Sequence, residues 1–321
     1  MIVGCKNSII PNGVTSIGDG AFRGCSGMTE LTLPNSVTSI GESAFSGCSG
    51  LTELILPNSV TSIGNAAFDG CSGMTELILP NSVRSIGDFA FSYCSGLEKI
   101  TVESGNSRYD SRDNCNSIID TEFNTLIVGC KNSIIPNSVT SIGYAAFSGC
   151  SGMTELTLPD SVTSIGPAAF YGCSGLTELI LPNSVTSIVN YAFSGCSGLS
   201  KITSLAEIPP MCGLKVFDGV NKTNCELIVP EGFVTAYKQA EVWNEFSNIR
   251  GFSGVEVTMA DGNTIRVIGN QIEISGYFTS VEVYGVNGTL IYKGKDNVVT
   301  VPSAGIYLVH VAGKTRKIVV E

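Results

Sequence analysis

The sequence predicts a mostly β protein in which a long coil of short, near-identical turns is followed by a small antiparallel β-sandwich. Three observations lead to this prediction. A 23-residue unit recurs along residues 1–202, short alternating apolar runs fill residues 255–321, and the chain is 43% hydrophobic but only 14% charged. Self-similarity at a fixed period of this length is typical of a solenoid, whose stacked turns share one core.

Each copy of the unit supplies three apolar edges. In the copy at residues 51–73 the apolar positions are Leu51, Leu54, Leu56, Val60, Ile63, Ala67, Phe68 and Cys71. The three leucines have the spacing of a short strand with one buried face, and Pro57 ends it because proline cannot donate to a ladder. A single turn cannot bury its own core, but turns stacked at about 4.8 Å per strand can.

The repeated unit is specific enough to suggest a family. Six near-perfect copies of its second part begin at Ser36, Ser59, Ser82, Ser138, Ser161 and Ser184. The full unit, L-T-E-L-x-L-P-N-S-V-T-S-I-G-x-x-A-F-x-G-C-S-G, resembles the BspA-like bacterial leucine-rich repeat, marked by L-P after the strand and by A-F-x-x-C. The resemblance covers residues 1–252. It implies a leucine-rich-repeat solenoid, a right-handed coil whose concave face binds partners at the cell surface.

The array is interrupted once, by an insert at residues 103–124. Residues 116–120 and 125–128 look like two short strands around a polar turn, so we expect a hairpin there. Residues 127–137 reappear unchanged as residues 2–12, which places the start of the chain inside an insert-type repeat. We therefore expect the natural protein to be longer, with further repeats and any export signal before residue 1.

The repeat degrades after residue 202. Residues 203–252 resemble the terminal repeat of the same family, and residues 234–246 have helical apolar spacing. The end of a solenoid exposes apolar core, and the only tryptophan, Trp243, is expected to cover it rather than to bind a ligand. We therefore expect a repeat array over residues 1–202 and a capping repeat over residues 203–252.

Residues 255–321 are expected to form a separate antiparallel β-sandwich. The expected hairpin turns are Asp261-Gly262, Gly269-Asn270 and Asn287-Gly288. The stretches VEVYGVNGTLIYKG, AGIYLVHV and KTRKIVVE are similar to the C-terminal sorting domains of the type IX secretion system. That resemblance implies export and attachment to the bacterial surface. A generic immunoglobulin-like sandwich would share the alternation of apolar and polar residues. It would less often contain both AGIYLVHV and KTRKIVVE at the end of the chain.

The chain has 12 cysteines, and most of them follow the repeat. Those spaced 23 residues apart are Cys25, Cys48, Cys71 and Cys94, then Cys150, Cys173 and Cys196, with equivalents at Cys5 and Cys130. Their Cα atoms would lie about 5 Å apart, which permits disulfides, but side chains aligned in a row favour a small buried hydrophobe. Cys212 and Cys225 fall outside this ladder and form a candidate disulfide in an exported protein. Cys115 has no assigned role.

Several functional classes are disfavoured. A net charge of -10 argues against nucleic acid and anionic lipid, and no apolar run approaches the roughly 20 residues of a membrane span. The only histidine, His310, has no nucleophile elbow near it, and no C-x-x-C pair indicates zinc. Asp110 and Asp113 are flanked by Arg108 and Arg112, which indicates a solvated ionic turn. We expect no enzyme, no cofactor, no metal and a monomer.

The strand residues between the leucines should face outward and align between turns. They define a candidate partner-binding stripe: Glu30, Glu53, Glu76, Glu155 and Glu178 in one column, and Thr32, Ile55, Ile78, Thr157 and Ile180 in the next. Glutamates about 5 Å apart repel each other, and Lys99 and Lys201 at the end of each run should offset part of that repulsion.

Two functions remain open at this point. The first is a cell-surface adhesion protein whose stripe binds an extracellular protein or glycan. The second is a structural spacer or accessory module of a longer surface protein, in which the stripe is a solvated face copied by repeat duplication. Fold alone does not decide between them.

Overall fold

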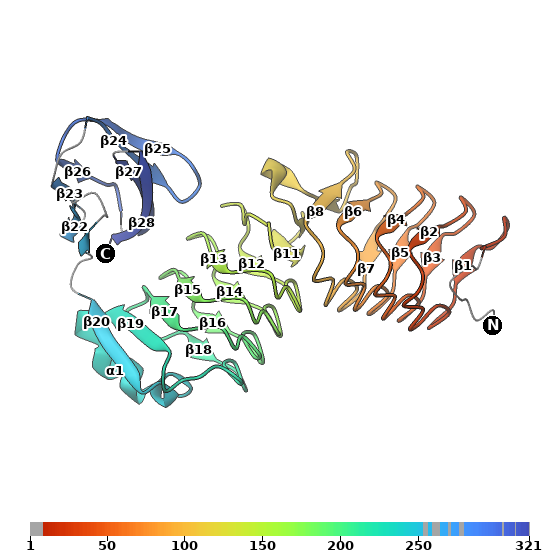
Figure 1. Cartoon of the computed structure of the whole chain (residues 1–321), viewed down its shortest axis with the longest axis horizontal. Helices are drawn as coiled ribbons and strands as arrows, with labels where there is room; N and C mark the ends of the chain where they lie inside the picture. The colour runs from red at the N-terminus through yellow and green to blue at the C-terminus, as the bar shows by residue number, and fades with distance from the viewer. Residues whose placement is uncertain are drawn as a thin grey trace.

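The computed structural model describes residues 9–252, 256–258, 264–268, 271–275, 279–303, 305–311 and 313–320. The chain forms an elongated array of stacked turns with a smaller β-sandwich beside its C-terminal end (Figure 1). This mostly β architecture confirms the predicted solenoid followed by an antiparallel sandwich. Cys5 and the expected turns at Asp261-Gly262 and Gly269-Asn270 lie outside the described residues.

Each regular turn contributes two short strands. The first carries the Glu-Leu pattern and occurs as β2 (Glu30–Thr32), β4 (Glu53–Ile55), β6 (Glu76–Leu79), β8 (Lys99–Val102), β13 (Glu155–Thr157), β15 (Glu178–Leu181), β17 (Lys201–Ser204), β19 (Glu226–Pro230) and β20 (Asn248–Phe252). The second carries Ser-Ile in most turns and occurs as β1 (Ser16–Ile17), β3 (Ser39–Ile40), β5 (Ser62–Ile63), β7 (Ser85–Ile86), β12 (Ser141–Ile142), β14 (Ser164–Ile165), β16 (Ser187–Ile188) and β18 (Met211–Cys212). Neighbouring turns pair in parallel and in register, with Ser39 opposite Ser62. Equivalent residues therefore form straight columns.

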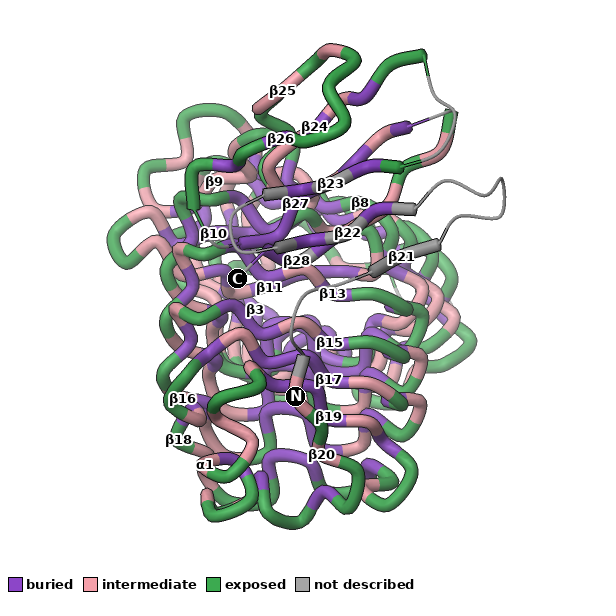
Figure 2. Tube along the Cα trace, turned by 90° about the vertical axis from the view of Figure 1, so that its left-hand side faces the viewer, coloured by how far each residue is buried: buried purple, intermediate pink, exposed green. Residues whose placement is uncertain are grey.

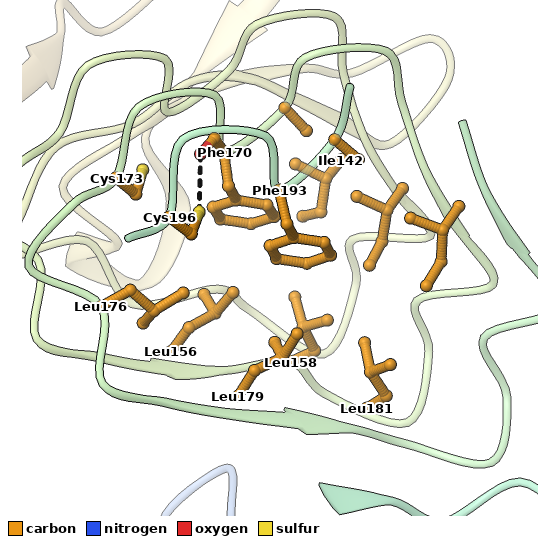
Figure 3. Packing of buried hydrophobic residues seen from close by; sticks show 14 of the residues in the cluster. Ile142, Leu156, Leu158, Phe170, Cys173, Leu176, Leu179, Leu181, Phe193 and Cys196 are labelled. Carbon is orange, nitrogen blue, oxygen red and sulfur yellow. Dashed lines mark hydrogen bonds between the residues drawn. The ribbon is translucent and has the colours of Figure 1, made fainter. Parts of the chain in front are cut away.

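The third edge of each turn closes the core with a ladder of phenylalanine rings. Phe147, Phe170 and Phe193 stack nearly parallel, with ring centroids 5.0 Å and 5.1 Å apart. An equivalent ladder runs through the first half from Phe22 to Phe91. Figure 2 shows that the buried segments line the inside of the coil, and Figure 3 shows two of the rings above the leucine layer. The core is thus one continuous stack within each half of the array.

Most of the ladder cysteines hydrogen-bond to the phenylalanine edge. The Sγ–H of Cys196 donates to the carbonyl oxygen of Phe170 at 3.2 Å, one turn away (Figure 3). Cys173 and Cys48 make the same bond to the preceding turn, at 3.1 Å in both cases. Burial raises the pKa of Cys196 to about 12, so the thiol stays protonated and able to donate. The repeated cysteine therefore combines a small apolar volume with a donor for an inward carbonyl.

The insert interrupts the strand edges but not the third edge. It contains β9 (Tyr109–Asp110), the 3-10 turn η1 (Arg112–Asn114) and β10 (Ile118–Asp120), and β11 (Thr125–Val128) follows directly after it. Strands β10 and β11 form an antiparallel hairpin, and β11 then pairs in parallel with β12. On the third edge the two halves join directly, because the Tyr93 N–H donates to the Ser148 carbonyl at 2.8 Å. This junction, the seam, brings residues 55 positions apart in the sequence next to each other.

The C-terminal end of the array is closed by aromatic side chains. Strands β19 and β20 flank η2 (Glu231–Phe233), α1 (Val234–Gln239) and η3 (Trp243–Glu245). Trp243 is fully buried, its ring packs against Phe217, and its Nε1–H donates to the Pro210 carbonyl at 2.8 Å. The helix is shorter than the 234–246 pattern suggested, because Ala240 is extended and Val242 has a φ of 70°.

The described residues of the C-terminal module form two four-stranded antiparallel sheets. One contains β21 (Glu256–Thr258), β22 (Thr264–Ile268), β23 (Gln271–Ser275) and β26 (Val298–Thr300), and the other β25 (Leu290–Gly294), β24 (Val281–Gly285), β27 (Gly305–Val311) and β28 (Lys314–Val320). Alternating residues of both sheets, such as Ile272 and Val309, are fully buried between them. Gly288, with a φ of 77°, makes the turn between β24 and β25.

Candidate partner-binding surface

The glutamate column of the stripe forms as the repeat spacing predicts. Glu30 lies opposite Glu53 in the β2–β4 pair, and Glu155 lies opposite Glu178 in the β13–β15 pair. All four side chains are exposed, whereas Glu76 is half-buried. The parallel register therefore holds like charges side by side at the solvent surface.

Each glutamate run ends at a lysine. Lys99 pairs with Glu76 at 2.6 Å, and Lys201 lies 3.6 Å from Glu178. Exposed ion pairs of this kind contribute only about 0–1 kcal/mol of stability. Their main effect is to offset part of the repulsion along the column.

The second column of the stripe is apolar and unevenly exposed. Ile55 is 53% exposed and Ile78 is 45% exposed, although isoleucine usually lies inside a protein. Thr157 and Ile180, at the same repeat position in the second half, are both half-buried. The two halves of the stripe therefore differ in what they present to solvent.

The insert divides the stripe into two groups. Strands β9 and β10 pack beside β8, at the end of the first run of strands, while β13 and β15 belong to a separate sheet that continues to β20. We call Glu30, Thr32, Glu53, Ile55, Glu76 and Ile78 the open group, and Glu155, Thr157, Glu178 and Ile180 the covered group. The ten predicted residues thus form two surfaces.

The C-terminal module contacts the covered group. Lys317 on β28 donates from Nζ to the Thr157 hydroxyl at 2.7 Å. Burial lowers the pKa of this lysine, although the nearby Glu155 and Glu178 act in the opposite direction. A cleft of about 470 Å³ between the two parts is lined by Asp160 from the solenoid and Tyr307 from the module, among others. The module therefore contacts the second half of the stripe at Thr157, while Glu155 and Glu178 stay exposed.

The candidate disulfide is not formed in this structure. Cys212 is half-buried, Cys225 is buried, and both are free thiols. Burial raises the pKa of Cys212 to about 12 and that of Cys225 to about 11, which disfavours the thiolate needed for exchange. Pairing of these two cysteines remains a prediction.

The other chemically distinctive residues lie in ordinary structural settings. His310 on β27 shares a hydrogen bond of 2.9 Å with the Thr315 hydroxyl on the neighbouring strand. Arg112 pairs with Asp110 at 2.9 Å, and Asp113 is exposed in the same turn. Asp110 and Asp113 therefore lie in a partly exposed ionic turn, whereas Asp120 of the same insert is buried and pairs with Arg108 at 3.1 Å.

One cluster was missed by the sequence analysis. The aromatic side chains Phe89, Tyr93, Tyr144, Tyr171 and Tyr191 converge on the third edge at the seam and line one hollow. They occupy four different positions of the repeat, so no column of aromatic residues is visible in the sequence. Their departure from the otherwise uniform unit was the signal that could have revealed them.

The stacked turns, the Glu-Leu strands and the Ala-Phe edge agree with a known repeat family. The family described as BspA type leucine rich repeat region matches residues 3–119 and 116–226, in 6 copies. The chain belongs to the BspA-type leucine-rich-repeat family. Proteins built on leucine-rich repeats generally bind other proteins, and the BspA-type array supplies a rigid scaffold for such contacts.

Solved structures share this BspA-type fold. A leucine-rich repeat protein from Eubacterium ventriosum ATCC 27560 matches with a TM-score of 0.55 and 24% identity, over 75% of this chain and 71% of that one. A leucine rich cell surface protein from Faecalibacterium prausnitzii A2-165 matches with a TM-score of 0.51 and 26% identity, over 74% and 76%. Among curated proteins no relative was found. No helix in the described part of the chain is long and apolar enough to cross a membrane.

Proposed function

We propose that this protein is a bacterial cell-surface protein that binds an extracellular protein partner through the open group of the stripe. The observation that carries the proposal is the exposed apolar column of Ile55 and Ile78, held beside the glutamates on paired strands. Apolar centres bordered by charge are typical of protein interfaces. Strands fixed by parallel pairing also present such a surface without a large entropic cost on binding.

The charge of the open group indicates the chemistry of the partner. Glu30 and Glu53 are exposed neighbours in a chain of net charge -10. A partner with Lys or Arg around an apolar contact would be attracted to this surface and oriented by it. The covered group contributes less, because Lys317 already occupies the Thr157 hydroxyl.

Two similarities support the surface location. The F. prausnitzii protein with the same fold is described as a cell surface protein. The C-terminal module resembles the sorting domains of the type IX secretion system in the stretches quoted above. Both similarities favour a protein that faces the medium, where an adhesion partner would be found.

The proposal predicts that charge reversal in the open group weakens partner binding. The full chain would be tested against an array of extracellular-matrix proteins at physiological salt. A double variant, Glu30→Lys with Glu53→Lys, removes the attraction to a basic partner and breaks no ion pair with any residue that the structure describes. We expect the affinity for the protein that binds wild type to fall at least tenfold, about 1.4 kcal/mol.

A matched control separates the stripe from net charge. The variant Glu42→Lys with Glu122→Lys changes the net charge equally at two exposed carboxylates outside the stripe. It should keep the wild-type affinity. Equal weakening by both double variants, or none by either, would refute the stripe as the binding surface, and a blank array for wild type would favour a structural spacer.

A further inference from the structure

The seam carries an aromatic groove that the protein-binding stripe does not explain. Phe89 packs edge-on against Tyr144, with centroids 4.7 Å apart, and Tyr93 lies 6.5 Å from Tyr171 in the same manner. Together with Tyr191 they line a hollow of about 520 Å³, within the range of about 300–1,000 Å³ usual for ligand pockets. Each of the five side chains is 37–43% exposed, so one side of each remains in contact with solvent.

The aromatic residues depart from the repeat only where they converge. Tyr93 stands where Gly47 and Gly70 stand in earlier turns, and Tyr171 stands where Ser46 stands. The turns that begin at Ser36 and Ser59 have no aromatic residue at the groove positions. Passive duplication of one unit would not place five rings from successive turns, and from both sides of the insert, around a single hollow.

Three of the rings are held on strained backbone. Tyr93, Phe89 and Tyr191 have left-handed φ values of 55°, 58° and 61°. Bulky residues rarely adopt this conformation, which costs roughly 1–3 kcal/mol each. Tyr93 also requires glycine beneath it, because a Cβ on Gly149 would lie 2.5 Å from the Tyr93 Cα. At the Phe89 and Tyr191 position this backbone is common to the repeat, because Ser43, Ala66, Ala145 and Ala168 share it with φ values of 50–52°. Only Tyr93 departs from the other turns, which have glycine at its position.

The groove lining is polar and uncharged, and the nearest carboxylates that act on its tyrosines, Asp69 on Tyr93 and Asp88 on Tyr144, lie outside it. Its lining includes the tyrosine hydroxyls, Asn190 and Ser148, and no ionisable carboxylate, lysine or arginine. Ser148 is 3% exposed, and its hydroxyl has no hydrogen-bond partner among the described residues. Burial raises the pKa of Tyr93 and of Tyr144, which keeps both phenols neutral and able to donate. The Ser148 hydroxyl is closed to a ligand, but a ligand with several hydroxyl groups would find partners in the tyrosine hydroxyls and Asn190.

The backbone around the groove disfavours a peptide ligand. The N–H groups of Tyr93, Ala145 and Ala168 donate to carbonyls of the next turn, to Ser148, Pro167 and Asn190 respectively. A peptide therefore cannot add as a strand here, and the groove offers few partners for its amides. Sugar rings need no such edge, because their C–H faces pack on aromatic rings while their hydroxyls reach side chains.

We propose that Phe89, Tyr93, Tyr144, Tyr171 and Tyr191 form a binding groove for a neutral glycan chain. The rings pack on the apolar faces of two or more pyranose units, and the tyrosine hydroxyls and the Asn190 amide hydrogen-bond to the sugar hydroxyls. The groove lies on a different edge of the coil from the stripe. Glycan binding here is therefore independent of protein binding by the open group.

The test uses substitutions that restore the repeat's own residues. Tyr93→Gly and Tyr171→Ser return these positions to the residues of other turns, and Tyr93→Gly also removes a strained φ, so folding should be kept. Isothermal titration of the full chain would use cellohexaose, maltohexaose and mannohexaose as neutral probes. We expect wild type to bind at least one of them and the double variant to bind it at least tenfold more weakly.

Two controls make the outcome specific. Phe123→Ala removes an exposed aromatic residue of the insert, away from the groove lining, and should bind the probe like wild type. The variant Glu30→Lys with Glu53→Lys should also bind it like wild type, which separates this proposal from the protein-binding function. The proposal fails if no neutral probe binds wild type, or if the double tyrosine variant binds it equally well. It also fails if that variant loses a protein partner instead.

Discussion

Truncation of Phe170 to alanine is expected to lower the free energy of unfolding by about 3–5 kcal/mol. The ring is fully buried and stacks on Phe147 and Phe193, one turn away on each side. Removal leaves a cavity in the middle of the ladder and weakens two interfaces between turns at once. In a solenoid, stability is close to a sum over turns and their interfaces, so no distant contact compensates.

The measurement is urea unfolding followed by circular dichroism, with Phe123→Ala as the matched control. Phe123 is 60% exposed on the insert, so the same chemical change there should stay within about 0.5 kcal/mol of wild type. A loss below about 1 kcal/mol for Phe170→Ala would show that the ladder does not stabilise the array, contrary to our account.

Replacement of Lys317 by glutamate is expected to release the C-terminal module from the solenoid. The new carboxylate would be partly buried beside Glu155 and Glu178, where both desolvation and repulsion oppose it. We expect the docked population to fall at least tenfold relative to the undocked one. Small-angle scattering should then report a larger maximum dimension for the full chain.

The lowered pKa of Lys317 gives this prediction a second arm. Because docking lowers the pKa of Lys317, the docked site disfavours the charged ammonium group overall. Loss of this charge should therefore not undock the module. Lys317→Met should therefore keep the compact scattering profile, and Lys295→Glu, at an exposed site on the module, should do the same. Release by Lys317→Met, or an unchanged profile for Lys317→Glu, would contradict this account of the contact.

Most of the fold follows from the repeat unit itself. The Leu51-Leu54-Leu56 pattern predicted the first strand of the turn, and the central residues of this pattern, Glu53–Ile55, form β4. The second strand, at Ser62–Ile63, was not predicted, because two residues give no periodicity and only pairing with neighbouring turns makes them a strand. The hydrogen bond from ladder thiols such as Cys71 was missed for the same reason, since the accepting carbonyl belongs to another turn.

The functional surfaces were less predictable than the fold. The positions of Glu and Ile along the strands predicted the stripe. The contact on Thr157 was not predictable, because it comes from Lys317, 160 residues away in the sequence. The aromatic groove depends on how the insert lets Tyr93 meet Ser148 across the seam. Contacts of this range are set by the stacking of turns and by module docking, which local sequence patterns do not encode.

The central claim is that a protein partner lies on the open group of the stripe. Carbodiimide labelling of carboxylates, measured by mass spectrometry with and without the partner found on the array, tests this most directly. We predict that the partner slows labelling of Glu30 and Glu53 several-fold and leaves Glu42 and Glu122 unchanged. Unchanged labelling of Glu30 and Glu53 in the complex, with protection elsewhere on the chain, would contradict the claim.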